Sequence, residues 1–471
     1  MPSPAAIDLR SLAVFRMGLG FLVALDQAVA LGNARVFYSD AGLLPRDLLH
    51  THFADSPWML SVHTLSGSTA WQAVLILLGL AAGVAVALGW RTRPALVIGW
   101  ALLCSLQVRN PTILYGGDTA LRLLCFWGLF LPLDACWSLA ARRSATPAPA
   151  GASFLSMATA GLLVQVVSIY EFTAALKWGN EWTRDGTALY YVLMNDQFVR
   201  APGRWLLGFP DLCRWLTHGT LWLEMAGPLA AFIPWRAAWW RLLVVAAFWG
   251  LHLGMAICLR LGCFPLIMMV AWLPFVPALA WDFLARRRPA ARARPPNSHV
   301  HPRPAPQFFA AFCMVLCLLW NLATVDYQRW NPLFPPWGRP VACLLRLDQW
   351  WSMFAPAPMT QDGWIVLDAT LADGSHVDLL RHGQPVSYAK PPNLSEEAPD
   401  WKWHKLLFNL LSPPWAVLRE RLGKDQAERW SLAHGPGQQV QSWTLVFMSE
   451  ETLPHYMAVE PQRVELAKGT R

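Results

Sequence analysis

The stretch AWQAVLILLGLAAGVAVALGW, residues 70–90, contains no charged side chain and is followed at once by RTR, residues 91–93. A run of about 20 apolar residues is long enough to cross the hydrocarbon core of a bilayer as a helix. The whole chain of 471 residues is 55% hydrophobic and only 14% charged, whereas a soluble protein has roughly a quarter of its residues charged. This composition predicts a polytopic membrane protein and argues against a soluble globular one.

Similar apolar stretches recur along the first 325 residues. Together they predict an all-α polytopic membrane bundle of about nine transmembrane helices. The N-terminal residues lack the cleavage pattern of a secretory signal, so we expect the first span to remain as an anchor. The predicted spans are residues 11–31, 70–90, 94–108, 119–139, 155–176, 212–233, 242–261, 263–283 and 308–325.

Arginines lie in every second loop between these spans. Cytoplasmic loops carry an excess of Lys and Arg, so the pattern predicts a cytoplasmic N-terminus and an extracytoplasmic chain after residue 325. The same arginines account for much of the net charge of +8, and we therefore expect no nucleic-acid partner. The loop arginines are Arg91, Arg93, Arg142, Arg143, Arg236, Arg241, Arg286, Arg287, Arg288, Arg292, Arg294 and Arg303.

The chain changes character after the last span. We expect a transmembrane domain over residues 1–330, with a cytoplasmic linker rich in Pro and Arg at about 285–306, and an outer part over residues 331–471. Residues 341–354 predict an interfacial amphipathic segment, followed by a small extracytoplasmic β-rich domain. Its predicted strands are residues 364–371, 376–380, 439–447 and 463–467, and its predicted helices are 403–411 and 415–421.

Lys177 is the only lysine among the first 389 residues, where every other basic side chain is Arg. Arg keeps its proton in proteins, whereas a desolvated Lys can lose it. One hypothesis is therefore that Lys177 is a catalytic base or nucleophile at the edge of the membrane. The alternative is that its side chain reaches from a helix end to the outer headgroups.

Three further polar residues lie within or at the ends of the predicted spans. Asp118 opens the fourth span and could orient a substrate, although capping of that helix and an ion pair with Arg122 would explain it as well. Glu224 and His252 lie in mid-span and should face the bundle interior. They could bond one another, or line a cavity or proton relay, and Tyr170 shares a helix face with Lys177.

His50, His52, Asp55 and His63 crowd the first outer loop. Zinc can be bound by such residues, but their spacing does not close a site, and we expect no metal.

Several dispersed motifs resemble the horizontally transferred transmembrane (HTTM) domain family, which includes the vitamin K-dependent γ-glutamyl carboxylases. The similarity covers about the first 360 residues. The matching stretches are residues 7–16, 37–42, 110–118 and 130–133, Lys177 with Trp182, Gly186, Thr187 and Ala188, and residues 252–254 and 349–356.

The resemblance implies an enzyme in which Lys177 acts as the base and a reduced quinone, such as vitamin K or menaquinol, is the cofactor. The carboxylases use this cofactor with oxygen and carbon dioxide to modify peptide Glu. Under this enzyme hypothesis Asp118 would orient the substrate or compensate charge beside Lys177, in a cavity lined by Tyr170, Glu224, His252 and Trp182. At the start of the matching span the carboxylases have an important His, and an Asp118 carboxylate does not reproduce a neutral imidazole donor.

A second hypothesis is a non-catalytic membrane factor for maturation or export of a secreted peptide or protein, with the outer domain as its working surface. Under both hypotheses the lipid bilayer and a secreted peptide or protein are the expected partners. The preference for Arg over Lys and the family resemblance suggest a bacterial inner membrane, with the C-terminal part in the periplasm.

Overall fold

The computed structural model describes residues 3–52, 58–143, 152–285, 304–454, 457 and 459–470. Most of the described chain is helical. The helices are α1 (Leu9–Gly32), α2 (Arg46–His52), α3 (Thr69–Leu88), α4 (Thr92–Arg109), α5 (Gly116–Gly128), α6 (Leu139–Arg142), α7 (Met157–Leu176), α8 (Asn180–Thr183), α9 (Ala188–Met194), α10 (Ala201–Leu206), α11 (Pro210–Ala230), α12 (Ala237–Cys258), α13 (Phe264–Ala271), α14 (Ala278–Ala285), α15 (Pro304–Val325), α16 (Tyr327–Trp330), α17 (Gly338–Leu344), α18 (Leu394–Glu397), α19 (Trp401–Asn409) and α20 (Val417–Ala433). The strands are β1 (Ile7–Asp8), β2 (Ser153–Phe154), β3 (Gln361–Leu371), β4 (His376–Asp378), β5 (Gln384–Pro385), β6 (Val440–Glu451) and β7 (Gln462–Thr470).

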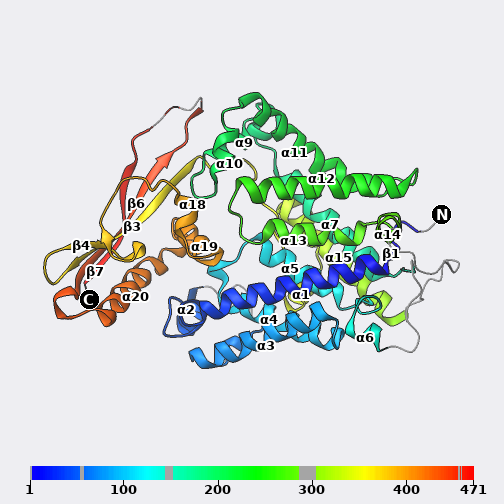
Figure 1. Cartoon of the computed structure of the whole chain (residues 1–471), viewed down its shortest axis with the longest axis horizontal. Helices are drawn as coiled ribbons and strands as arrows, with labels where there is room; N and C mark the ends of the chain where they lie inside the picture. The colour runs from blue at the N-terminus through cyan, green and yellow to red at the C-terminus, as the bar shows by residue number, and fades with distance from the viewer. Residues whose placement is uncertain are drawn as a thin grey trace.

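The long helices form a bundle, and the N-terminus and the C-terminal sheet lie at its opposite ends (Figure 1). Helix α1 packs along α3, and α7 contacts both α11 and α15. Glycines permit the closest approach, because a Cβ at Gly20 would lie only 2.6 Å from the carbonyl oxygen of Gly83. Small residues at helix crossings are typical of bundles in membranes.

Among the described residues, five helices are long and apolar enough to cross a membrane, namely α1, α3, α7, α12 and α15. Helices α13 and α14 pass the same test together but are bent by 90° at their junction, which makes six if the pair is one span. By length and composition, these helices are compatible with a multi-pass membrane protein. The predicted helical character of the bundle is confirmed, whereas the count of about nine spans and the orientation stay predictions.

Local sequence explains why three of the predicted spans are not long and apolar enough to count as membrane-crossing helices. Helix α5 has only 13 residues and ends at Gly128, shortly before Pro132. Helix α4 has arginines near both of its ends, which shorten its apolar part. Helix α11 has Pro228 inside it and polar side chains along its length, including Glu224.

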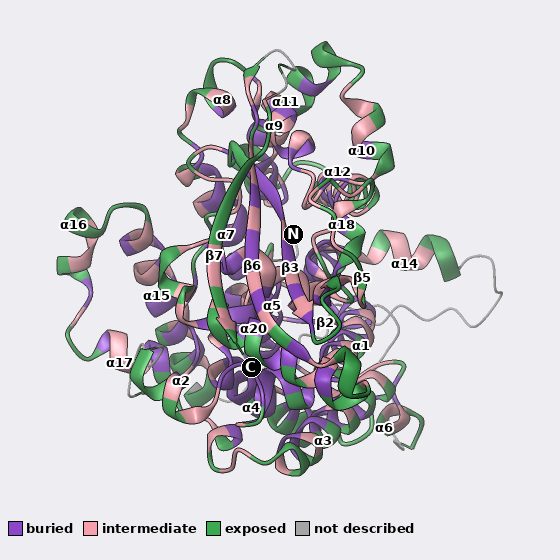
Figure 2. Ribbon diagram, turned by 90° about the vertical axis from the view of Figure 1, so that its left-hand side faces the viewer, coloured by how far each residue is buried: buried purple, intermediate pink, exposed green. Residues whose placement is uncertain are grey.

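Apolar side chains are exposed on the outward faces of the spans, as the mixture of exposed and buried positions in Figure 2 illustrates. Such a surface is unfavourable in water and suits the hydrocarbon core of a bilayer. On α3 the exposed residues are Val74, Leu77, Leu78, Val84 and Leu88.

The C-terminal region contains an antiparallel sheet in the order β5-β4-β3-β6-β7. The predicted hairpin is confirmed: β3 and β4 are joined by a turn in which Gly374 has a φ of +82°. All four predicted strands are present. The second predicted helix extends to Ala433 as α20, and this helix packs on β6 and β7.

The predicted interfacial segment, residues 341–354, contains only the end of α17 and then continues as irregular chain. Trp351 is fully buried in the bundle, whereas Trp350 is 66% exposed. The segment therefore lies against the bundle as irregular chain, and part of it lines cavities described below. We call the part that follows α17, residues 345–354, the strap. Residues 286–303, most of the predicted cytoplasmic linker, lie outside the described residues.

Helix α19 joins the C-terminal region to the bundle. Lys402 Nζ donates to Asp26 Oδ1 of α1 at 2.8 Å, and both residues are buried. Asn33 Nδ2 donates to Asp400 at 2.7 Å, and the rings of Phe37 and Trp403 lie 5.0 Å apart. These contacts fix α19 against the end of α1.

We predict that Lys402→Met destabilises the protein by about 3–5 kcal/mol, because it leaves the Asp26 carboxylate buried without a counter-charge. Thermal unfolding of the detergent-solubilised protein measures the effect. The matched control is Lys468→Met, which removes an exposed pair with Glu465 and should change stability by less than about 1 kcal/mol. Addition of Asp26→Asn to Lys402→Met should restore much of the loss. Equal melting temperatures for Lys402→Met and wild type would contradict the assignment.

Candidate active site

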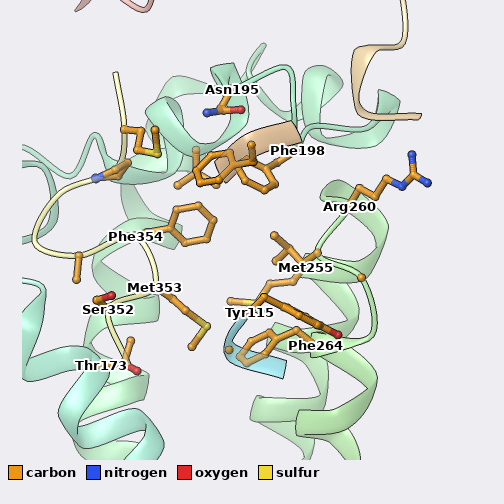
Figure 3. Close-up of a pocket in the computed structure, with 18 of the residues that line it drawn as sticks. Tyr115, Thr173, Asn195, Phe198, Met255, Arg260, Phe264, Ser352, Met353 and Phe354 are labelled. Atoms are coloured by element: carbon orange, nitrogen blue, oxygen red, sulfur yellow. The ribbon is translucent and has the colours of Figure 1, made fainter. Parts of the chain in front are cut away.

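Four of the predicted site residues, Lys177, Tyr170, Glu224 and His252, line one cavity of about 440 Å³. Its walls come from distant parts of the chain: the start of α5, the end of α7, α9, α11, α12, residues 350–359 and α19. Most of the lining is apolar, and Figure 3 shows the aromatic side chains of Tyr115, Phe198, Phe264 and Phe354 around the space. A mainly apolar cavity with a few convergent polar groups is the usual form of a small-molecule site.

The Lys177 amine is buried in the wall of this cavity. Helix α7 ends at Leu176, and Lys177 is its C-terminal cap. The amine donates to Glu224 Oε2 at 2.5 Å and lies 4.4 Å from the ring centre of Trp182. Lys177 and Glu224 are each only 4% exposed, so each charge depends on the other for stabilisation. Trp182 lies behind the amine and not among the lining residues.

His252 bonds Tyr170 and not Glu224. The Tyr170 hydroxyl lies 2.6 Å from His252 Nε2 and accepts a hydrogen bond from Trp272 Nε1 at 2.9 Å. In the tautomer in which the Tyr170 hydroxyl donates to Nε2, the proton of a neutral imidazole is on Nδ1. His252 Nδ1 is buried and has no hydrogen-bond partner among the described residues. In that tautomer, Nδ1 is a donor without a partner.

Asp118 lies apart from this group and does not line the cavity. Its carboxylate accepts from the Tyr115 backbone N–H at 3.0 Å, so it caps α5 as the sequence predicts. Arg122 pairs with Asp348 at 2.7 Å instead of with Asp118. Because Tyr115 lines the cavity, Asp118 helps to position one wall, and its catalytic role stays a prediction.

The part of the cavity wall that α19 contributes was not predicted from the sequence. Trp401, His404, Lys405 and Phe408 all line the cavity, although they lie more than 200 residues after Lys177. The sequence does mark α19 as unusual, because this helix contains two of the six lysines in a chain that otherwise uses Arg. Nothing in the local sequence, however, indicates that this helix returns to the bundle.

Burial changes the titration of both polar residues that α19 brings to the cavity. It lowers the pKa of the Lys405 amine to about 8, an effect opposed by the negative charge of Asp118. It also lowers the pKa of His404 to about 4, while His404 Nε2 lies 2.8 Å from the carbonyl oxygen of Gln197. Lys405 has no ion pair among the described residues, and its amine lies 4.7 Å from the Phe408 ring centre.

Within the part of the chain that the structure describes, no group of three or more His, Cys, Asp or Glu side chains is placed to hold a metal ion. Of the predicted loop cluster, His63 is buried and its Nδ1 lies 2.7 Å from Ser105 Oγ. Asp55 lies outside the described residues.

Comparison of the chain with protein-family models, with curated proteins and with solved structures gave no match. The resemblance to the HTTM family therefore stands on the sequence motifs alone.

We predict that Lys405 reacts with a small acylating reagent at lower pH than an ordinary lysine. Its reactivity should rise about tenfold per pH unit up to about pH 8 and then level off, because the neutral amine is the reactive form. Peptide mass spectrometry after brief labelling measures the rate at Lys405, with the exposed Lys468 as internal control. A Lys405 rate that still rises steeply near pH 10 would contradict the prediction.

Proposed function

We propose that the protein is a membrane enzyme in which Lys177 acts as a base on a lipid-like, reduced-quinone cofactor, and that it modifies a secreted peptide or small substrate at the outer membrane face. The observation that carries the proposal is the buried Lys177–Glu224 pair in the wall of a mainly apolar cavity. Ionisable groups at membrane depth are costly and usually functional.

The pair provides a route for a proton. Lys177 Nζ donates to Glu224 Oε2 at 2.5 Å, so its proton can pass to the carboxylate over a very short distance. The resulting neutral amine then accepts a proton from a hydroxyl held in the cavity. The first transfer leaves the pair neutral. The second gives the pair a net charge of +1, which is balanced by the negative charge left on the deprotonated hydroxyl, so the cavity as a whole stays neutral. A catalytic base needs such direct hydrogen-bond reach to its target.

The lining residues fit a quinone-type ligand. The volume of the cavity, about 440 Å³, lies within the roughly 300–1,000 Å³ typical of small-molecule pockets. Tyr115, Phe198, Phe264 and Phe354 would contact the ring, while Lys177 and His252 Nδ1 would face its oxygens. When bound, a reduced quinone would supply electrons for the oxygen-dependent chemistry that the family resemblance implies.

A second substrate would reach the cavity from the side of the C-terminal region. Residues of α19 and of the segment 350–359 form the wall of the cavity that faces the C-terminal region. In the proposed bacterial inner membrane, with the N-terminus in the cytoplasm, a peptide would approach from the periplasm. Asp118 would act from outside the cavity, as the cap of the helix that carries Tyr115 and as a negative charge near Lys405.

We predict that Lys177→Arg abolishes menaquinol-dependent oxygen consumption by the purified protein, with a loss of about 10²–10⁴-fold, the usual contribution of a positioned general base. The substitution keeps the positive charge beside Glu224 and removes the deprotonable amine. Lys468→Arg, on the exposed edge of the sheet, is the matched control and should be unaffected. Native mass spectrometry of wild type and Lys177→Ala should reveal a bound quinone.

Two results would overturn this proposal. One is full activity of Lys177→Arg, and the other is a cavity that takes up no quinone when menaquinol is added. The second result would favour the non-catalytic maturation factor, and crosslinking from the outer surface of the C-terminal region would then identify its protein partner.

A further inference from the structure

A second and larger cavity, of about 880 Å³, lies between α2, α5, α15 and the strap that follows α17. Figure 2 shows α15, α16 and α17 on the flank of the molecule near α2. Tyr115, Gly116 and Trp350 line this cavity and the Lys177 cavity alike, so they form a shared wall. Nothing in the proposed reaction uses the second cavity.

Three arginines line the second cavity, namely Arg122, Arg339 and Arg346. Among its described lining residues, Asp348 is the only carboxylate. Arg122 Nη2 already pairs with Asp348 Oδ2 at 2.7 Å, and Arg122 Nη1 donates to Gln107. One carboxylate therefore faces three guanidinium groups, which leaves an excess of positive charge in the lining.

Arg346 is the least compensated of the three. The residue is only 5% exposed, and its Nε and Nη1 atoms are buried without a hydrogen-bond partner among the described residues. Its closest carboxylate oxygen is Asp348 Oδ1, 3.4 Å from Nε. A buried guanidinium with unmade hydrogen bonds is costly unless an anion completes it.

Arg339 is held in place by contacts that do not involve a carboxylate. Its Nη2 donates to Asn331 Oδ1 at 2.7 Å, and its guanidinium lies 5.2 Å from the ring centre of Trp320. These contacts satisfy the side chain without a carboxylate, so its charge remains available. The planar guanidinium group matches the oxygens of phosphate in paired hydrogen bonds.

The surroundings suit a ligand from the membrane interface. Trp350 and Trp58, which line the cavity, are 66% and 50% exposed. Exposed tryptophans gather at the level of lipid headgroups. We propose that this arginine-lined cavity binds a phosphate group, and that the phosphate is the headgroup of an anionic lipid.

Binding of phosphatidylglycerol to the full-length protein in a zwitterionic detergent tests this proposal, with native mass spectrometry as the readout. We predict saturable binding to wild type and at least roughly tenfold weaker binding to Arg346→Gln, because charge-assisted hydrogen bonds are lost. Arg93→Gln, an exposed arginine on α4, is the matched control and should bind like wild type. Arg339→Gln is a second variant that keeps the buried Arg346–Asp348 contact.

Competition distinguishes the two sources of phosphate. Phosphatidylcholine, whose headgroup has no net charge, should bind much more weakly than phosphatidylglycerol. Displacement of the lipid only by other anionic lipids supports a headgroup site, whereas tight binding of inorganic phosphate alone would overturn the lipid assignment. Equal lipid binding by wild type, Arg346→Gln and Arg339→Gln, with all three folded by thermal unfolding, would overturn the site itself. None of these readouts depends on quinone binding.

Discussion

The ion pair between Lys402 and Asp26 joins the two parts of the molecule, and this junction gives the Lys177 cavity the wall that α19 forms. Asp26 lies near the end of the first membrane helix, and Lys402 lies on α19, 376 residues later. With α19 fixed there, His404 and Lys405 on the same helix lie at the cavity. If α19 were displaced, the cavity would lose the part of its wall that Trp401, His404, Lys405 and Phe408 form.

Two other buried ion pairs also connect elements that are distant in sequence. Lys177 and Glu224 connect α7 with α11, and Arg122 and Asp348 connect α5 with the strap after α17. Separation of such a pair leaves an uncompensated charge in a poorly solvated place, so the pairs specify which helices pack together. The apolar contacts between the helices are less selective, since most of these surfaces would pack equally well on lipid.

Periodicity and composition predict the elements but not these pairings. The hairpin of β3 and β4 and the helical spans follow from local patterns, and the unusual use of Lys at position 177 indicates a special residue. The partner of Lys177 could not be predicted, because Glu224 and His252 are equally polar mid-helix residues and only the packing decides that His252 faces Tyr170. The wall formed by α19 and the arginine cluster around Arg346 also depend on contacts between residues far apart in the chain.

The distribution of Lys and Arg supports a division of chemistry between the two cavities. Lys177 and Lys405, whose amines can lose a proton, line the cavity proposed for proton transfer, whereas the neighbouring cavity is lined by three arginines, which keep their charge. Permanent charge suits an anion that must stay bound, and a titratable amine suits a proton that must move. Because Tyr115, Gly116 and Trp350 form a wall of both cavities, a lipid phosphate in the second would stabilise the wall of the first. The anionic lipid would then be part of the architecture of the proposed active site and not an incidental ligand.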